Sequence, residues 1–313
     1  MNNSKKTNSD FYPNLDWLRL LLAIQVVAIH CGVAPTVFIN PVPAFLAISG
    51  FVVLGSLERR SVGQFFIGRA LRVLPLLFVS FIAIWVLYNP EEMLKNILYW
   101  LWPTGAVPVN NVAWSLIYEE AFYLLLAILF SLGVYRSKIG PILIFAAITF
   151  TTITLELKIL NFTSYILGTS FFLGNIAYLY RHQIRQYVNP WVATAPLLLL
   201  TSYIYQMPYI NIGWRPEIWI DIAAFLAMLI FAIAGPQLPR LTIDISYSLY
   251  LLHCLVRNEL VYFIPTGARL FVFVMLAALP ICYASWYLIE KPSMRLKGRL
   301  SELSLLKARL SAA

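Results

Sequence analysis

Arg19 and His30 are ionisable side chains inside the first long apolar segment, which ends at His30. Ionisable groups are costly within a membrane span, so a functional role is the first interpretation for them. Eleven residues separate the two, which on an α-helix is about 20° more than three turns and roughly 16 Å of rise. Both side chains should point to similar sides of one helix and mark a path through the lipid, as in an enzyme or transporter. The structural alternative is an interfacial ion pair of Asp16 with Arg19, and a hydrogen-bonded His30 at a helix end.

Arg69 and Arg72 form a second candidate group, on the side of the membrane where the chain termini are expected. Three residues apart, they share one face of a helix. Their forked guanidinium groups suit phosphate oxygens. Anchoring of a helix at the positively charged side of the membrane is the alternative interpretation.

The third group opens the fourth expected span, on the outer side, with Ser115 beside Trp114 and the adjacent Glu119 and Glu120. On a helix the two carboxylates point about 100° apart. A carboxylate near a helix N-terminus also gains from the helix dipole. Trp114 and Tyr118 suit an ordinary aromatic belt, whereas the acidic pair favours a functional site.

Tyr250 and His253 form the fourth group, three residues apart on a similar face of another apolar segment. A hydrogen-bonded core histidine is the alternative interpretation of His253. The remaining histidine, His182, lies in a charged segment and is expected to be a solvated loop residue.

The composition places these groups in a membrane protein. Hydrophobic residues make up 60% of the 313 and charged residues 12%, against about 25% charged in a soluble domain. The long continuous apolar runs favour helices over a barrel. The net charge of +9 does not indicate nucleic-acid binding, because Lys and Arg cluster in alternate loops. Cys31, Cys254 and Cys282 are scattered in apolar segments, with no disulfide framework or metal spacing, and no metal site is expected.

The sequence therefore predicts an all-α, polytopic bundle of about ten transmembrane helices. The expected spans lie near 15–33, 42–57, 71–88, 112–133, 139–156, 163–180, 191–207, 217–234, 242–262 and 268–289. With ten spans both termini share one side, and 18 of the 23 Lys and Arg residues fall there. This asymmetry predicts cytoplasmic termini.

Three regions follow from this pattern. Residues 1–14 are a polar cytoplasmic tail, residues 15–293 the transmembrane domain, and residues 294–313 a basic cytoplasmic tail. The C-terminal tail could form an amphipathic helix on the inner leaflet or be an irregular end. No small-x-small cleavage site follows the first apolar segment at the right place, so it is interpreted as an uncleaved helix.

Taken in order, the groups closely resemble the acyltransferase-3 family of membrane O-acyltransferases, in its stand-alone form without an appended esterase-like domain. The matching pieces cover almost the whole chain: Leu15-Asp16-Trp17-Leu18-Arg19 with His30, Ile48-Ser49-Gly50-Phe51, Arg69 with Arg72 and Pro75, Trp114-Ser115-Leu116-Ile117-Tyr118-Glu119 with Phe122-Tyr123, Ser246 to His253, and Glu290-Lys291-Pro292. Two positions depart from the family pattern. Trp17 replaces the usual glycine and could reshape the pocket beside Arg19, and Ala121 replaces a polar residue.

The resemblance implies acyl transfer, commonly of acetyl, from cytoplasmic acetyl-CoA or another acyl-CoA to a hydroxyl of a glycan or lipid-linked sugar. It also implies the bacterial inner membrane as the location, with no permanently bound cofactor and no nucleic-acid partner. The hypothesis for the donor is that Arg69 and Arg72, with Arg19, hold the nucleotide phosphates at the inner face. The pantetheine arm would then reach inward toward His30.

The remaining roles follow from the same hypothesis. His30 would act as general base on the acceptor hydroxyl or as a transient acyl carrier. Glu119 would orient His30 or bind the sugar, with Glu120 as the substitute candidate, and Asp16 would steer Arg19. Ser115, Tyr250 and His253 are assigned to substrate contact or support.

Two other functions share these sequence features. Intramembrane charge and interrupted apolar segments also describe secondary transporters, although paired halves with matching interrupted helices are not seen. A non-catalytic membrane partner in polysaccharide assembly is the third interpretation.

Overall fold

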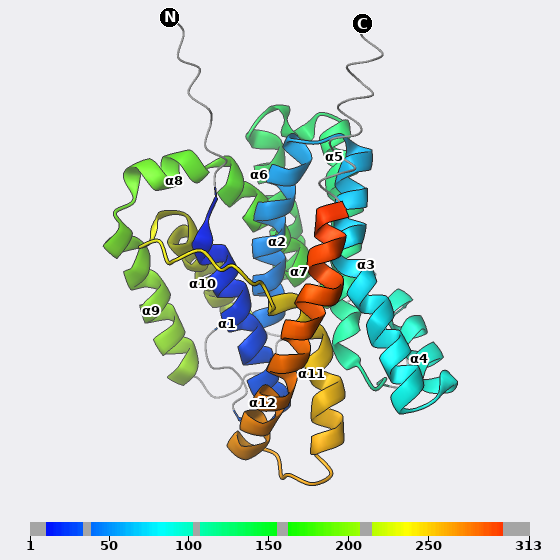
Figure 1. The fold of residues 1–313 in the computed structure, drawn as a ribbon. Helices are drawn as coiled ribbons and strands as arrows, with labels where there is room; N and C mark the ends of the chain where they lie inside the picture. The colour runs from blue at the N-terminus through cyan, green and yellow to red at the C-terminus, as the bar shows by residue number, and fades with distance from the viewer. Residues whose placement is uncertain (1–10, 34–38, 103–106, 155–161, 207–214, 297–313) are drawn as a thin grey trace, which may run out of the picture.

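The computed structural model describes residues 11–33, 39–102, 107–154, 162–206 and 215–296, and this part of the chain is helical with no strand. Figure 1 shows a bundle of long helices, with a shorter α4 beside it. The elements, in chain order, are α1 (Pro13–His30), α2 (Pro41–Glu58), α3 (Val62–Leu87), α4 (Pro90–Leu101), η1 (Asn111–Ala113), α5 (Trp114–Ser131), η2 (Val134–Arg136), α6 (Ile139–Thr154), α7 (Phe162–Leu179), α8 (Arg181–Tyr187), α9 (Pro190–Gln206), α10 (Arg215–Ala234), α11 (Ser246–Leu260), α12 (Ala268–Ser285) and η3 (Trp286–Glu290).

Each of the ten expected spans overlaps one helix, although α3 begins well before residue 71 and α11 after residue 242, and the prediction of an all-α fold is confirmed. By length and composition, four helices in the described ranges can cross a membrane: Pro41–Glu58, Val62–Leu87, Asn111–Ser131 and Ala268–Leu296. Four shorter apolar helices accompany them. The count of ten spans, with cytoplasmic termini, therefore stays a prediction.

Large apolar side chains cover the outward faces of α3 and α12. On a soluble protein such continuous exposure would be an interaction surface, but on helices of this length it suits contact with lipid. These exposed side chains include Phe78, Ile82, Trp85, Val86, Val272, Phe273 and Leu276. The chain is therefore a membrane protein.

Two buried clusters organise the interior. The first joins α2, α7 and α10, and the second joins α3, α11 and α12. The two halves of α1 contribute to different clusters, with Leu18 in the first and Val27 in the second. Helix α1 therefore connects them, and this places Arg19 and His30 at different levels of the bundle.

Helices α2 and α7 approach closely because glycines face their contact. A Cβ atom on Gly50 would collide with the backbone carbonyl of Phe171, and one on Gly174 with that of Ala47. Small residues allow membrane helices to pack backbone to backbone in this way. The contact fixes α2, which carries Ser49 next to Gly50.

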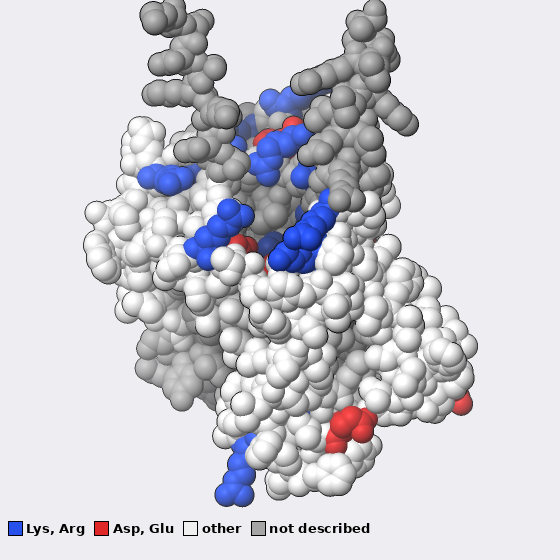
Figure 2. Space-filling model, viewed as in Figure 1, with Lys and Arg blue, Asp and Glu red and all other residues white. Residues whose placement is uncertain are grey.

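The two ends of the described chain lie at the same end of the bundle, where α1 begins and η3 is followed by the last described residues (Figure 1). Figure 2 shows that most Lys and Arg atoms on this face gather toward that end, around a hollow in the surface, while others lie at the opposite tip. The tails at 1–10 and 297–313, including the expected amphipathic helix, lie outside the described residues.

Candidate active site

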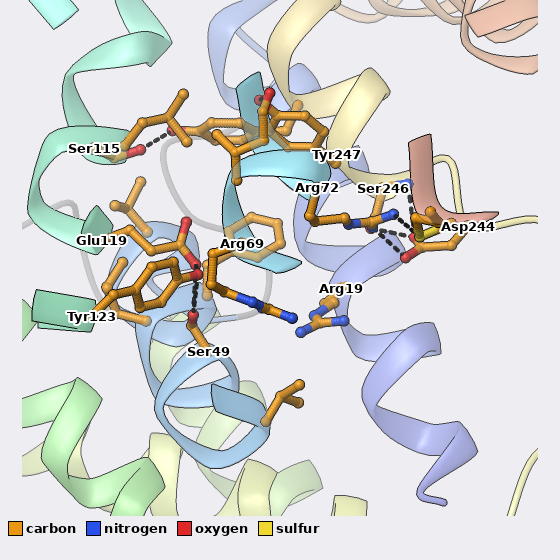
Figure 3. A pocket seen from close by; sticks show the side chains of 18 of the residues that line it. Arg19, Ser49, Arg69, Arg72, Ser115, Glu119, Tyr123, Asp244, Ser246 and Tyr247 are labelled. Carbon is orange, nitrogen blue, oxygen red and sulfur yellow. Dashed lines mark hydrogen bonds and ion pairs between the residues drawn. The ribbon is translucent and has the colours of Figure 1, made fainter. Parts of the chain in front are cut away.

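A cavity of about 300 Å³ opens among the helices that carry the predicted groups. Its walls come from α1, α2, α3, α5 and α11, with Trp286 of η3 and Met294 at one side (Figure 3). The predicted site residues in its lining are Arg19, Arg69, Arg72, Ser115, Glu119 and Tyr250. Side chains from four of the sequence groups therefore meet at one place.

Arg72 is held by two carboxylates. Its Nη2 lies 2.6 Å from Oδ2 of Asp244, and its Nη1 lies 3.7 Å from Oε2 of Glu290. Asp244 also accepts hydrogen bonds from the backbone N–H and hydroxyl of Ser246. The guanidinium group of Arg72 is thus largely satisfied by the protein itself. Its charge ties α3 to the segment before α11 and to η3.

The segment expected at 242–262 becomes helical only at Ser246, so Asp244 belongs to the connection between α10 and α11. Burial alone would raise the pKa of the Asp244 carboxyl. The positive charges of Arg72 and Arg19 and the hydrogen bonds from Ser246 outweigh burial and hold that pKa below its ordinary value. Asp244 is therefore a carboxylate throughout the neutral range.

Arg69 and Arg19 have weaker contacts with carboxylates than Arg72 has. Among the described residues Arg69 makes neither a hydrogen bond nor an ion pair, and its buried Nε has no acceptor. Its guanidinium lies 5.9 Å from the ring centroid of Tyr123. Arg19 reaches Asp16 only at 3.9 Å. Because a buried N–H group without an acceptor is costly, this part of the cavity suits an anionic ligand.

Glu119 of α5 also lies in the cavity wall. Its Oε1 accepts a hydrogen bond from Oγ of Ser49 at 2.5 Å and another from the hydroxyl of Tyr123. Neither bond involves His30, so Glu119 does not orient that ring here. Glu120 is half-buried and does not line the cavity, as expected from carboxylates that leave the helix in different directions.

Ser115 and Tyr250 connect α5 to α11 in the cavity wall. Their hydroxyl oxygens lie 2.8 Å apart, and the Tyr250 hydroxyl also donates to the backbone carbonyl of Val112 at 3.0 Å. Phe45 of α2 packs edge-on against the Tyr250 ring. These contacts place the Tyr250 side chain in the cavity wall.

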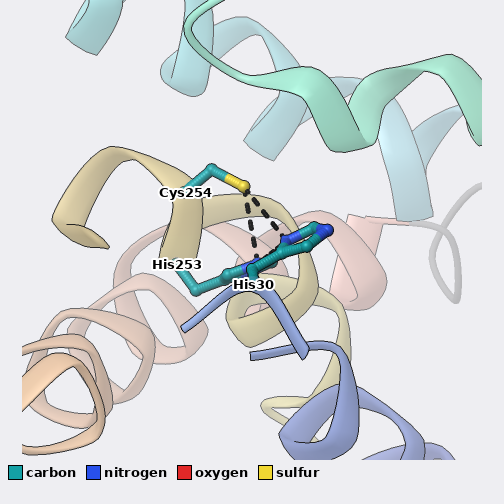
Figure 4. Close-up of side chains that lie close together, drawn as sticks. All are labelled: His30, His253 and Cys254. Atoms are coloured by element: carbon teal, nitrogen blue, oxygen red, sulfur yellow. Dashed lines mark hydrogen bonds between the residues drawn. The ribbon is translucent and has the colours of Figure 1, made fainter. Parts of the chain in front are cut away.

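His30 and His253 lie behind this wall and do not line the cavity. Nδ1 of His30 is 2.8 Å from Nε2 of His253, and the two rings are stacked. Figure 4 shows the thiol of Cys254 beside both rings. His253 is fully buried and His30 half-buried. The structure thus separates the arginines from the histidines. Tyr250 lines the cavity with the arginines, and its backbone carbonyl accepts a hydrogen bond from Nδ1 of His253.

Several site residues were not singled out as such from the sequence. Ser49 and Glu290 stood only in matching motif pieces, and the structure now gives each a partner. Tyr123 likewise stood only in a matching motif piece, and the structure pairs it with Glu119. Asp244 carries no signal beyond its closeness to the piece from Ser246 to His253. No metal site was expected from the scattered cysteines, yet Sγ of Cys254 and the facing nitrogens of His30 and His253 all lie within 4.8 Å of one another. Three potential metal ligands converge there, which the spacing of the cysteines did not predict.

Comparison with known proteins identifies the class. The family model described as an acyltransferase domain matches residues 12–287. The chain belongs to this family, the acyltransferase-3 family, and is an acyltransferase that transfers groups other than aminoacyl groups. Nodulation protein 10 of Rhizobium leguminosarum bv. viciae is 28% identical over 376 residues, covering 100% of both chains. No solved structure matches.

Proposed function

We propose that this membrane acyltransferase moves an acyl group, commonly acetyl, from a cytoplasmic acyl-CoA to a hydroxyl of a cell-surface glycan or lipid-linked sugar. The observation that carries the proposal is Arg69, whose buried Nε has no acceptor among the described residues and which lines the cavity together with Arg19. Tyr250 lines the same cavity, and its carbonyl accepts a hydrogen bond from His253 of the histidine pair. The name of the Rhizobium relative refers to nodulation and gives no substrate.

The donor's phosphates suit the arginine side of the cavity. Phosphate oxygens would supply the acceptors that Arg69 lacks among the described residues, and guanidinium groups bind phosphate through paired hydrogen bonds. The basic end of the molecule in Figure 2 would attract an anionic nucleotide before it binds. We assign this end to the cytoplasm, in line with the predicted ten spans and the excess of Lys and Arg on the terminal side.

The cavity volume of about 300 Å³ is at the lower end of small-molecule sites. It suits the narrow pantetheine arm rather than a whole coenzyme A, so the nucleotide would stay at the arginines while the arm extends toward Ser115 and Tyr250. Glu119, held by Ser49 and Tyr123, would contact the substrate from the wall. The thioester must then pass the Ser115–Tyr250 pair to reach His30.

Transfer would use His30 as a general base, in preference to an acyl carrier. The imidazole takes the proton from the acceptor hydroxyl while the hydroxyl oxygen attacks the carbonyl carbon of the thioester. The C–S bond then breaks, and the imidazolium returns the proton to the departing thiolate of coenzyme A. The acceptor would approach from the outer side, and the enzyme would act in the bacterial inner membrane.

The experiment is transfer of a radiolabelled acetyl group from acetyl-CoA, with the purified protein in lipid nanodiscs and glycans or lipid-linked sugars as acceptors. His30→Ala is compared with His182→Ala, which changes an exposed histidine that does not line the cavity. We expect acetyl transfer by wild type and His182→Ala and none by His30→Ala. Equal turnover by all three proteins would remove His30 from the mechanism. Absence of transfer from any acyl-CoA would refute the proposal that acyl-CoA is the donor.

A further inference from the structure

The hydrogen bonds of His253 determine where its proton lies. Its Nδ1 is 2.9 Å from the carbonyl oxygen of Leu249 and 2.8 Å from that of Tyr250. A carbonyl oxygen can only accept, so Nδ1 carries the hydrogen. In a neutral imidazole the other nitrogen is then an acceptor, and Nε2 of His253 presents a lone pair.

That lone pair in turn determines the proton position on His30. Nδ1 of His30 is the atom 2.8 Å from Nε2 of His253, so it must be the donor. The hydrogen of a neutral His30 ring is then on Nδ1, which leaves a lone pair on Nε2. Nε2 of His30 has no hydrogen-bond partner among the described residues, and this side chain is half-buried rather than sealed.

Neutral rings fit the surroundings of the pair. Arg257 donates from Nε to the backbone carbonyl of His30 at 3.0 Å and from Nη1 to Asn258, so a positive charge already lies next to the imidazoles. No carboxylate hydrogen-bonds to either ring among the described residues. A second positive charge on fully buried His253 would be strongly unfavourable.

The positive charge of Arg257 beside the imidazoles also disfavours a metal cation between the two rings. The thiol of Cys254 lies 3.6 Å from Nδ1 of His30 and 3.4 Å from Nε2 of His253. However, the two nitrogens are at hydrogen-bonding distance from each other, and Sγ can donate to Oδ1 of Asn111 at 3.3 Å. A metal-bound cysteine is a thiolate, which cannot donate. The contacts therefore describe a hydrogen-bonded pair.

We propose that His253 is a positioning residue that holds His30 as the Nδ1–H tautomer, with Nε2 free to take the proton of the acceptor hydroxyl. The catalytic part of this inference rests on the function proposed above. His253 would do for His30 what a carboxylate does for the histidine of a serine protease, namely fix its tautomer and orientation and stabilise the imidazolium. Because the carbonyl of Tyr250 anchors His253, a cavity residue sets the position of the pair.

The tautomer can be measured directly, because the chain contains three histidines. Protein in the His182→Gln background, labelled with ¹⁵N-histidine in nanodiscs, leaves two imidazoles whose nitrogen shifts report which atom carries hydrogen. We expect the Nδ1–H form for both His30 and His253. An Nε2–H form of His30, or shifts of a metal-bound ring together with one equivalent of zinc in the purified protein, would overturn the proposal.

Two substitutions separate positioning from structural support. In His253→Gln the side-chain carbonyl can reach the place of Nε2 and still accept from His30. In His253→Asn the shorter amide can bond the helix carbonyls but does not reach His30. We expect His253→Asn to lower kcat about 10- to 100-fold, the range for loss of an orienting partner, with KM for acetyl-CoA unchanged. His253→Gln should retain most of kcat.

Equal kcat for the two variants, or a change in KM alone, would contradict the positioning role. Acetyl-CoA binding and thermal unfolding of both variants serve as folding controls. If both fail to fold, the wild-type nitrogen shifts still decide the tautomer. An inactive wild type with two Nδ1–H rings would refute the proposed function but not the hydrogen-bonded pair. An active wild type with an Nε2–H form of His30 would refute the pair alone.

Discussion

Arg72 lies 2.6 Å from Asp244, although 172 residues separate them in the chain. With Glu290 on its other amino group, Arg72 joins three parts of the fold around the cavity. Its neighbour Arg69, one helical turn earlier, has no such partner in the ranges that the structure describes. Two arginines that look equivalent in the sequence thus have different surroundings, and this difference can be tested.

Arg69→Ala should weaken donor binding with little effect on folding. The side chain makes no ion pair within the described structure, so its loss removes a phosphate contact worth about 1.5–3 kcal/mol. We expect a 10- to 100-fold higher Kd for acetyl-CoA, measured by calorimetry in nanodiscs. Arg59→Ala, an exposed arginine near the start of α3, is the matched control. Similar losses in the two variants would indicate a general charge effect.

Arg72→Ala should instead unfold the protein more easily. It leaves half-buried Asp244 and buried Glu290 without their cation, and removing one partner of a fully buried pair costs about 3–5 kcal/mol, an upper value here. The midpoint of thermal unfolding should fall clearly below that of Arg69→Ala. Adding Asp244→Asn removes the orphaned charge and should restore part of the loss. A normal midpoint for Arg72→Ala would show that the pair is not structural.

Gly174→Ala should destabilise the contact of α2 with α7, because the added methyl group meets the backbone of Ala47. Gly63→Ala in α3 is the matched control, since an added Cβ atom there has nothing within 4 Å. Alanine has a better helix propensity than glycine by about 1 kcal/mol, so the control should be neutral or stabilising. Thermal unfolding in detergent measures both. Opposite signs are expected, and a neutral Gly174→Ala would argue against the close approach.

Glu119→Gln and Glu120→Gln should have unequal effects on acetyl transfer. Only Glu119 lines the cavity, where it accepts hydrogen bonds from Ser49 and Tyr123. Its neutral amide would weaken these charge-assisted bonds, which are roughly twice as strong as neutral ones. We expect kcat/KM to fall at least about 10-fold for Glu119→Gln, corresponding to 1.4 kcal/mol, and to stay within about 3-fold for Glu120→Gln. The opposite order would exchange the two roles.

The positions of most helices could be predicted because each expected span is one apolar run bounded by turn or proline residues. Helix α4 (Pro90–Leu101) was not predicted, since Glu91, Glu92 and Lys95 break its apolar pattern. Its Asn89 cap and i,i+4 ion pair become visible only in the structure. Helix α4 joins the bundle through packing against other helices, which the local sequence pattern does not predict.

The site was predictable residue by residue but not as an arrangement. The sequence placed Arg19 and His30 on one helix and implied one shared cavity. In the structure Arg19 lines the cavity, whereas His30 does not and lies beside His253, 223 residues away. Periodicity indicates which residues share a helix face, but not which other helix that face meets. The pairings of Arg72 with Asp244 and of His30 with His253 could therefore not be predicted from the sequence.

Cys254→Ala should preserve acetyl transfer, and metal chelators should not inhibit the wild type. In the hydrogen-bonded pair proposed above, the thiol borders the two imidazoles but holds neither ring in place, because His253 is anchored by the carbonyls of Leu249 and Tyr250. Alanine removes only the contacts of a small buried side chain. If a metal bridged the rings instead, both treatments would remove its binding, and a lost ligand or second-shell partner typically costs 10–100-fold. We therefore expect kcat of Cys254→Ala within about 3-fold of wild type, in acetyl transfer assays with and without a chelator. Loss of activity in both arms, recovered by added zinc in the wild type alone, would assign the three side chains to a metal centre.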